Sequence, residues 1–145
     1  MRLPSAAKVQ WHFLAITLLC ATAGLAEPYK ITRVIDGDTV EIAVGFLPEP
    51  LPAKLSIRVL GIDTPEKAPR AKCEAEAEKA KLASAFTKAA IANAREIDVE
   101  LKEWDKYGGR VLGYVYLDGK SLSELLIGEG LARPYKGEAK SSWCE

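Results

Sequence analysis

The chain has 145 residues, of which 48% are hydrophobic and 28% are charged. This length supports one globular domain with a single hydrophobic core, and hardly two. The 20 basic and 20 acidic side chains balance, which excludes a disordered polyelectrolyte and a basic arm that binds nucleic acid through bulk charge. Any anionic ligand must therefore be held by local groups.

Residues 1–26 have the layout of a secretory signal peptide, in which two basic residues precede an apolar run that ends in small residues. Cleavage can follow Ala23 or Ala26, and we favour Ala26 because strand-like sequence begins just beyond it. The alternative is an uncleaved membrane anchor, but the apolar run is shorter than the roughly 20 residues that a span needs. We expect a domain of residues 27–145 that is secreted or periplasmic and has no stable membrane anchor.

The predicted signal peptide contains His12, the only histidine of the chain. The remaining domain therefore cannot use a Ser/His/Asp triad, a histidine acid/base pair or a histidine zinc site. Its catalysis would have to use carboxylates, Arg, Lys, Tyr, hydroxyls or a metal bound by oxygen.

Two cysteines, Cys73 and Cys144, remain after the signal peptide. They suit one disulfide in an oxidising compartment, and two unpaired thiols are the alternative. The bridge would close a loop of about 70 residues and stabilise the fold by about 4 kcal/mol at most. It would also tie down the C-terminal tail.

Alternation and helix composition predict five strands and two helices. The strands are expected at Tyr29–Ile35, Thr39–Phe46, Lys54–Ile62, Glu96–Lys102 and Arg110–Leu117, with helices at Cys73–Ala94 and directly after Ser121. This order predicts an α+β fold, a small five-stranded barrel of the oligonucleotide/oligosaccharide-binding (OB) type with a helix after the third strand and a C-terminal helix. A generic open α+β sheet is the alternative.

Local patterns add detail to these elements. The first helix is expected to bury a stripe of Leu82, Phe86 and Ala90 and to serve as core support. The second helix is expected to begin with a capping box of Ser121 and Glu124.

Three segments concentrate polar residues that folding does not need: 35–39, 58–66 and 105–110. Each has an ordinary interpretation by itself, as an Asp-Gly turn, a solvated loop after a strand, and a charged hairpin connection. The third strand directs Arg58 away from the apolar face formed by its neighbours.

Together these segments supply the groups needed to hydrolyse a phosphodiester without histidine. Asp38 and Asp63, with a backbone carbonyl and water, are suited to a hard divalent cation, which would polarise the phosphate. Arg58 and Arg110 are suited to gripping its non-bridging oxygens. Glu66 is placed to orient or deprotonate the attacking water.

Four stretches in this order resemble the staphylococcal nuclease, or thermonuclease, family: VIDGDTVEI (34–42), IRVLGIDTPE (57–66), DKYGGRVLGYVY (105–116) and LSELLIGEGLAR (122–133). The resemblance implies the five-stranded OB barrel and calcium-dependent hydrolysis of DNA and RNA that leaves 3′-phosphates. It covers nearly all of residues 28–135, whereas the first motif alone would be weak evidence.

The resemblance also implies roles for the metal and catalytic residues. Asp38 and Asp63 match the family's calcium carboxylates, and Thr64 matches the residue that offers a backbone carbonyl. Arg58 matches the first phosphate arginine, and Glu66 matches the glutamate credited with water activation.

Further matches concern the substrate. Lys106 and Tyr107 match residues that contact the terminal phosphate of the substrate. Arg110 matches the second phosphate arginine, but Gly109 is an extra residue before it, and a one-residue slip would reverse its direction unless a bulge absorbs it. Tyr135 resembles a tyrosine that stacks on the base, although it sits one position early.

The chain departs from the best-known family member in being slightly acidic after signal removal and in ending ten residues after Tyr135, without a third helix. We hypothesise that a bridge between Cys73 and Cys144 fastens the tail beside the active-site loop in place of that helix. The leading interpretation is a monomeric, secreted, calcium-dependent nuclease of low sequence specificity. The alternative is an OB-type nucleic-acid-binding module without catalysis, but such a binder has no use for three carboxylates beside a polyanion.

Overall fold

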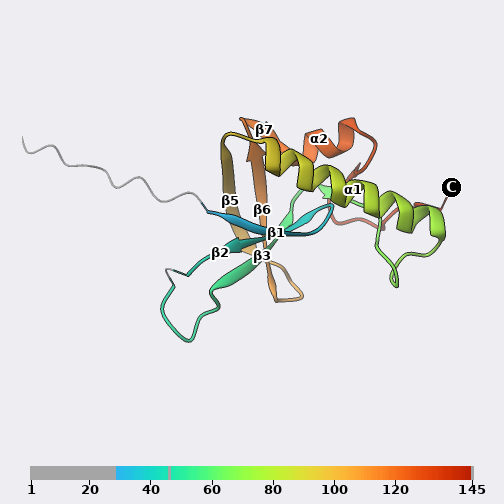
Figure 1. Ribbon diagram of the computed structural model, residues 1–145. Helices are drawn as coiled ribbons and strands as arrows, with labels where there is room; N and C mark the ends of the chain where they lie inside the picture. The colour runs from blue at the N-terminus through green and yellow to red at the C-terminus, as the bar shows by residue number, and fades with distance from the viewer. Residues whose placement is uncertain (1–28, 46, 145) are drawn as a thin grey trace, which may run out of the picture.

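The computed structural model describes residues 29–45 and 47–144 (Figure 1). The predicted signal peptide and Phe46, the expected last residue of the second strand, lie outside the described residues. Within the described part of the chain, neither helix combines the length and the apolar character needed to cross a bilayer.

The longer elements follow the predicted order of three strands, a helix, two strands and a helix, and three two-residue strands, β4, β7 and β8, are additional. They are β1 (Ile31–Asp36), β2 (Thr39–Ala43), β3 (Lys54–Val59), β4 (Ile62–Asp63), α1 (Glu74–Asn93), β5 (Ile97–Trp104), β6 (Arg110–Leu117), β7 (Lys120–Ser121), α2 (Leu122–Gly128) and β8 (Arg133–Pro134). The strand order β1-β2-β3-β6-β5 forms the main sheet, and β4 and β8 form a separate pair. The α+β class is confirmed and the sheet is OB-like, but within residues 29–45 and 47–144 its edge strands β1 and β5 do not pair to close the barrel.

The register of the central strands determines where the arginines lie. β3 and β6 are parallel, with Ser56 opposite Arg110 and Arg58 opposite Leu112. Because side chains alternate along a strand and paired residues share a face, Arg58 and Arg110 point to the same side of the sheet. Two residues from strands far apart in the sequence thus become neighbours.

The core lies on the opposite side of these strands. Fully or nearly fully buried side chains of β2, β3 and β6 form it, and two leucines of α2 complete it: Val40, Ile42, Ile57, Val59, Val111, Val115, Leu122 and Leu126. Burial of each such side chain contributes about 1.5–3 kcal/mol. The sheet side that faces away from this core is therefore free to carry polar groups.

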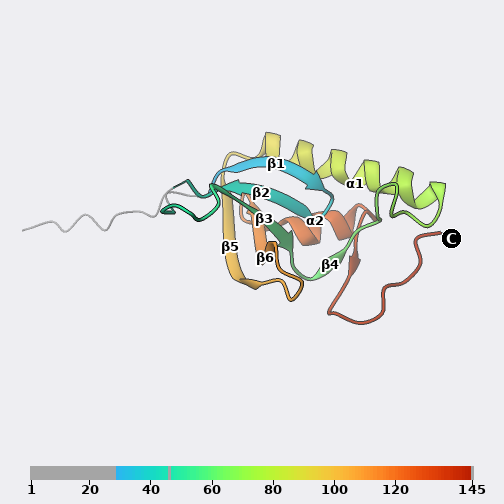
Figure 2. The same cartoon turned by 90° about the horizontal axis from the view of Figure 1, so that it is seen from below.

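The predicted apolar stripe of α1 is only partly right. Phe86 and Ala90 pack against the core, but Leu82 is 61% exposed. Apart from Glu76, the buried residues of the helix are small ones, including Ala80 and Ala83, and they lie against the β1–β2 turn (Figures 1 and 2). Small side chains allow this close approach, which a leucine stripe would prevent.

The expected third strand is interrupted. β3 ends at Val59, and Gly61 adopts a left-handed backbone with φ of 81° before the chain resumes as β4. Glycine reaches this conformation without steric cost, so the chain bends sharply there. The bend turns Asp63 back toward Arg58.

The predicted capping box of α2 is wrong. Ser121 occupies the N-cap position, but its side chain makes no capping hydrogen bond among the described residues. Instead, the hydroxyl of Ser123 donates to the carbonyl of Leu60 at 2.9 Å, which fastens α2 to the bend after β3.

Candidate active site

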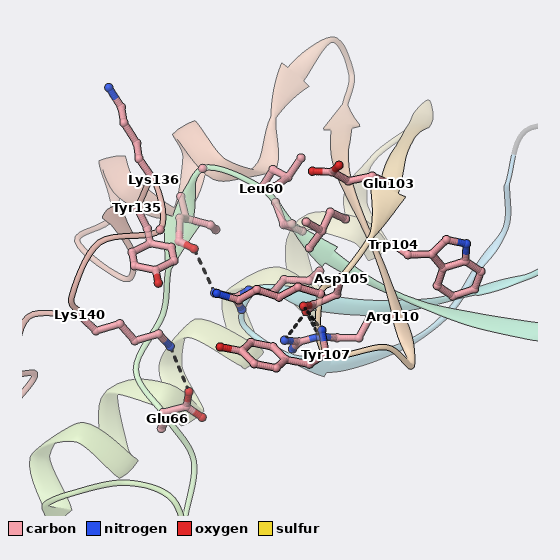
Figure 3. A pocket seen from close by; sticks show the side chains of 17 residues that line it. Leu60, Glu66, Glu103, Trp104, Asp105, Tyr107, Arg110, Tyr135, Lys136 and Lys140 are labelled. Carbon is pink, nitrogen blue, oxygen red and sulfur yellow. Dashed lines mark hydrogen bonds and ion pairs between the residues drawn. The ribbon is translucent and has the colours of Figure 1, made fainter.

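Two of the polar segments, 58–66 and 105–110, line a pocket of about 560 Å³, and the third, 35–39, meets them through the ion pair of Asp38 with Arg58. Six of the predicted site residues line it: Arg58, Glu66, Lys106, Tyr107, Arg110 and Tyr135. Figure 3 shows Glu66 on one wall and Tyr107 and Arg110 on the facing wall. Asp38 and Asp63 lie behind this surface, in ion-pair contact with Arg58.

Arg58 is the centre of a buried charge cluster. Its Nη1 lies 2.5 Å from Asp38 Oδ2 and its Nη2 lies 3.9 Å from Asp63 Oδ1. A further hydrogen bond runs from Nη2 to the carbonyl of Ile62 at 3.3 Å. Burial alone would lower the pKa of Arg58, but Asp38 and then Asp63 hold that pKa above its ordinary value. The guanidinium therefore remains charged and fixed in direction.

Asp36 belongs to the same cluster, although its Asp-Gly context suggested only a turn. Its Oδ1 is buried and has no hydrogen-bond partner among the described residues. Burial, and then the neighbouring charge of Asp38, raise the pKa of Asp36. The spacing of two acids across Gly37 on an alternating segment was the sequence signal for this pair.

These oxygen donors fit a hard divalent cation. Asp38 and Asp63 are 3% and 5% exposed, and Thr64, which directly follows Asp63, is also buried. Buried like charges are costly unless a cation offsets them, and the orphaned oxygen of Asp36 is one that such a cation would satisfy directly or through water. The residues present therefore suit the predicted metal.

Glu66 is held by a residue that sequence reasoning did not single out. The buried carboxylate of Glu76, on α1, accepts the backbone N–H of Glu66 at 3.2 Å and that of Lys72 at 2.7 Å. Both ends of the loop between β4 and α1 are thereby fixed. The side chain of Glu66 stays partly exposed and accepts a hydrogen bond from Arg70 Nε at 3.0 Å.

The extra Gly109 does not displace Arg110. Gly108 and Gly109 both have positive φ, 72° and 74°, and lie in the turn before β6, so the turn absorbs the additional residue. Arg110 donates from Nε to Asp105 Oδ2 at 2.8 Å, and its Nη2 lies 2.7 Å from the same oxygen. The guanidinium is thus kept on the pocket wall (Figure 3).

Asp105 organises the β5–β6 turn around Arg110. Its Oδ1 also accepts the backbone N–H of Tyr107 at 3.1 Å. Burial raises the pKa of Asp105, but the hydrogen bonds from Tyr107 and Arg110 outweigh burial and lower it. The carboxylate is therefore charged at neutral pH.

Aromatic rings surround the pocket mouth. Tyr107 is 80% exposed with Lys106 Nζ 5.0 Å from its ring centre, and Tyr135 follows β8 on the other wall. Trp104, 62% exposed at the end of β5, also lines the pocket and was not predicted. Exposed rings beside basic groups are suited to stacking on unpaired bases.

The C-terminal tail contributes side chains to the site although its sequence has little periodicity. Trp143 is 6% exposed, and its indole N–H donates to Asp63 Oδ2 at 3.2 Å. Lys140 Nζ lies 2.6 Å from Asp63 Oδ1 and 3.4 Å from Glu66 Oε1. Partial burial lowers the pKa of Lys140, but Asp63 and then Glu66 raise this pKa by more than burial lowers it. The ammonium group therefore stays charged.

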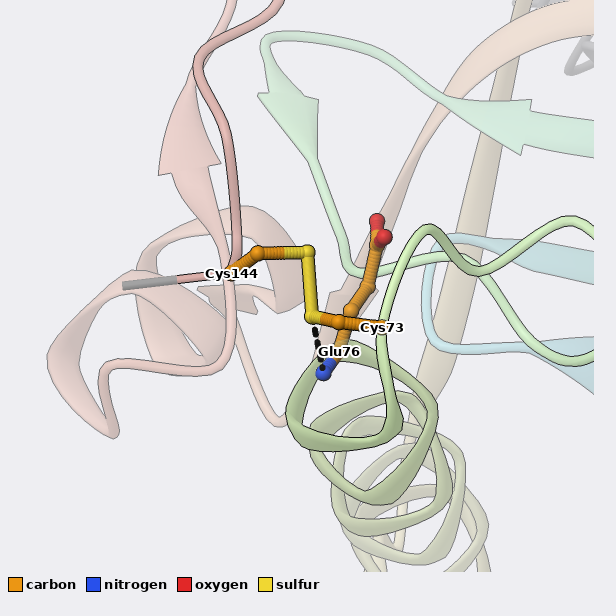
Figure 4. A group of neighbouring side chains, drawn as sticks. All are labelled: Cys73, Glu76 and Cys144. Carbon is orange, nitrogen blue, oxygen red and sulfur yellow. Dashed lines mark hydrogen bonds between the residues drawn. A yellow bond between two sulfur atoms is a disulfide. The ribbon is translucent and has the colours of Figure 1, made fainter.

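The expected bridge between Cys73 and Cys144 is present, with Cα atoms 5.9 Å apart (Figure 4). It joins the tail to the start of α1. Cys73, Glu76 and Cys144 bring possible metal-ligating atoms within 4.8 Å of one another. Because the sulfurs are bonded together and Glu76 accepts backbone N–H groups, this cluster is structural.

The fold and the pocket define a class of protein. It is an OB-like α+β domain whose site combines carboxylates and arginines and suits an anionic ligand. The sequence profile described as Staphylococcal nuclease homologue matches residues 56–143, more than half of the chain. The chain belongs to the staphylococcal nuclease family. The matched residues exclude the β1–β2 turn, so the place of Asp38 in the site comes from the structure.

Named relatives agree with this assignment. The chain is 35% identical over 118 residues to a thermonuclease of Staphylococcus hyicus, covering 77% of this chain and 64% of that protein. It is 38% identical over 109 residues to a thermonuclease of Staphylococcus intermedius, covering 74% and 59%. It is 36% identical over 107 residues to endonuclease YncB of Bacillus subtilis, covering 71% and 46%. The chain thus spans about half to two thirds of the length of these relatives.

Proposed function

We propose that this chain is a metal-dependent nuclease that hydrolyses phosphodiester bonds of DNA and RNA with little sequence specificity. The observation that carries the proposal is the convergence of Arg58, Arg110 and Glu66 on one pocket, with Asp38 and Asp63 paired to Arg58 behind it. We propose Ca²⁺ as the ion, because the donors are carboxylate and carbonyl oxygens without nitrogen or sulfur.

Asp38, Asp63 and the backbone carbonyl of Thr64 would hold the cation, which when bound polarises the phosphate and offsets its charge. Arg58 and Arg110 donate hydrogen bonds to the non-bridging oxygens as negative charge increases there. Their fixed partners, Asp38 and Asp105, orient both guanidiniums before the substrate arrives.

Glu66 accepts a proton from the attacking water while the oxygen of that water forms a bond to phosphorus. The bond from phosphorus to the 5′ oxygen breaks, this oxygen takes a proton from solvent, and the phosphate stays on the 3′ side. Lys106 and Tyr107 line the same pocket as Arg110 and would contact a terminal phosphate. Tyr135 and Trp104 would stack on unpaired bases, which favours single-stranded substrates.

We propose that the protein is exported as a monomer without a stable membrane anchor and acts in the periplasm or outside the cell. A disulfide suits an oxidising compartment, and residues 1–26 have signal-peptide character. The balanced charge of the chain implies few released counterions and a weak dependence of substrate affinity on salt.

The test is digestion of heat-denatured DNA and of RNA with calcium, magnesium or chelator. We expect cleavage with calcium, none in chelator, and products that a polymerase extends only after phosphatase removes their 3′-phosphates. Glu66→Gln should lower kcat by about 10²–10⁴ because it removes the base. Glu103→Gln, which changes an exposed acid of the same pocket, is the matched control.

Undiminished cleavage in chelator would reject the metal role. Tight binding of single-stranded DNA without cleavage under any of these conditions would support the competing function, an OB-type binding module. Full activity of Glu66→Gln would require a different base.

A further inference from the structure

We propose that Lys140 is an active-site residue: its ammonium group is an internal counter-ion for Asp63 and Glu66, and a divalent cation must displace it to bind. This inference rests on the proposed metal-dependent function. Lys140 lies in none of the four motif segments, so sequence reasoning offered no signal for it.

The contacts place this ammonium where the cation would bind. Lys140 Nζ is 2.6 Å from Asp63 Oδ1, and it reaches Glu66 Oε1 at 3.4 Å. Among the described residues, Oδ1 of Asp63 accepts no well-aligned hydrogen bond, so its charge is balanced by ion pairs, of which that with Lys140 is the shorter. A ligand oxygen in ammonium contact cannot also coordinate a doubly charged ion without strong repulsion between the two cations.

The tail that carries Lys140 is firmly built into the molecule. On one side Tyr135 donates its backbone N–H to the carbonyl of Gly61 at 2.9 Å, and on the other side Cys144 is bonded to Cys73. Between them, Trp143 is buried with the Arg133 guanidinium 4.0 Å from its ring centre. Ten residues held at both ends therefore keep the Lys140 backbone beside the pocket.

Trp143 and Lys140 engage different oxygens of the same carboxylate. The indole N–H binds Oδ2 of Asp63, whereas the ammonium faces Oδ1. The indole is buried and can stay in place, while the Lys140 side chain is 42% exposed and can swing away. Exchange of the ammonium for a metal ion thus needs only side-chain rotation, with Asp63 still oriented by Trp143.

The need for a counter-ion follows from the local charges. Arg58 pairs closely with Asp38 and contacts Asp63 only at 3.9 Å. Asp63 therefore depends on a second cation, which Lys140 supplies before metal arrives, whereas Glu66 also pairs with Arg70 at 3.0 Å. Removing this ammonium should favour the metal-bound state because the ion no longer competes for Asp63.

The experiment measures metal affinity of the oxidised full chain in two ways. Ca²⁺ binding is followed by calorimetric titration, and Tb³⁺ binding is followed by tryptophan-excited luminescence. Lys140→Met keeps a long side chain without charge and should bind both ions at least several-fold tighter than the wild type. Lys140→Arg restores the positive charge and should return the affinity toward the wild-type value. Lys136→Met is the matched control, because Lys136 lines the same pocket but points away from Glu66 (Figure 3), and its affinity should not change.

Thermal unfolding separates this role from a merely structural one. In chelator, Lys140→Met should unfold at a lower temperature than the wild type, and calcium should raise its Tm by more than it raises that of the wild type. A structural lysine would lower Tm equally with and without calcium.

The variant Asp38→Asn distinguishes failure of the Lys140 inference from failure of the proposed function. Unchanged or weaker metal affinity in Lys140→Met, with affinity lost in Asp38→Asn, would overturn the role of Lys140 and leave the proposed function standing. Absence of ion binding in the wild type and in Lys140→Met would overturn both.

Discussion

Arg58 and Arg110 reach the same pocket, but their surroundings give them different properties. The Arg58 side chain is 16% exposed and pairs with the buried carboxylate of Asp38. The Arg110 side chain is 36% exposed and pairs with Asp105. Breaking a buried pair leaves an uncompensated charge, while a pair with one partly exposed member is screened by solvent on that side. Loss of Arg58 is therefore expected to damage the fold as well as the site, and loss of Arg110 mainly the site.

Asp105→Asn tests the residue that orients Arg110. It should lower kcat and kcat/KM for single-stranded DNA several-fold, because a mobile Arg110 stabilises the charge that increases on the phosphate less well. The lowered pKa of Asp105 also has a consequence for stability. A carboxylate with a lowered folded pKa stabilises the fold above its unfolded pKa, about 3.9, and this contribution is lost as pH falls through the folded pKa.

Urea denaturation across pH checks the sign. The wild type should be more stable than Asp105→Asn at neutral pH, and the difference should shrink as pH falls below about 4. Lys106→Met, a neighbour in the same turn, is the control for the hairpin. A difference in stability that grows on acidification would contradict the assigned pKa direction.

Some site residues could be predicted from sequence and others could not, for a definite reason. Asp38, Arg58 and Asp63 lie at the ends of strands or in the turn between them, and Glu66 follows β4 after a proline, so alternation and turn residues indicate their positions. Lys140 and Trp143 lie in a tail without periodicity, where contacts depend on where the chain is tied down. No local pattern carries that information.

At the level of elements, the packing of α1 against the β1–β2 turn positions two of the acids. Thr87 Oγ1, on α1, donates to the carbonyl of Gly37 at 2.8 Å. A Cβ added at Gly37 would lie 2.8 Å from Ala83 Cβ and 3.1 Å from Thr64 Cγ2. The predicted stripe of Leu82, Phe86 and Ala90 was wrong at Leu82, which is exposed, because the close packing of this helix selected small residues such as Ala80 and Ala83.

Gly37→Ala should therefore destabilise the fold by about 1–3 kcal/mol through overpacking. It should also weaken calcium binding, because the crowded turn carries Asp38. The measurements are urea denaturation and calcium titration, with Gly45→Ala as control, since a Cβ there meets no atom within 4 Å in the described part of the chain. Adding Ala83→Gly should recover part of the loss, and full additivity of the two changes would contradict the proposed contact.

The bend at Gly61 was missed for a related reason. Apolar residues continue through Leu60 and Ile62, so the sequence is typical of one long strand. The break becomes visible only when β8 supplies a separate partner for β4. Pairing between distant segments decided the local structure.

At the level of the whole molecule, the element order and composition were enough for the fold class, because amphipathic strands and an Ala-rich helix leave few ways to bury one core. The parallel pairing of β3 with β6 and the open edges were not predictable, because register between distant strands is a tertiary property. The bridge between Cys73 and Cys144 was predicted from cysteine counting alone.

This bridge supports a further prediction. Replacing both cysteines with serine should lower the free energy of unfolding by about 4 kcal/mol at most, because the unfolded chain regains the freedom of a loop of about 70 residues. Trypsin should also cleave after Lys136 and Lys140 faster, because the tail is released at its end. The measurements are urea denaturation and timed proteolysis, with cleavage after the exposed Lys88 as the internal control. Unchanged cleavage rates would mean that Trp143 holds the tail without the bridge.

The parallel contact between β3 and β6 has a consequence for the life of the polypeptide. During synthesis, the segment with Arg58 emerges long before the strand with Arg110, and the tail that holds Trp143 and Lys140 comes last. A partly translated chain surrounded by ribosomal RNA thus contains only part of the candidate active site. Under the proposed function, cleavage therefore cannot begin before the strand with Arg110 has been synthesised and has paired with β3.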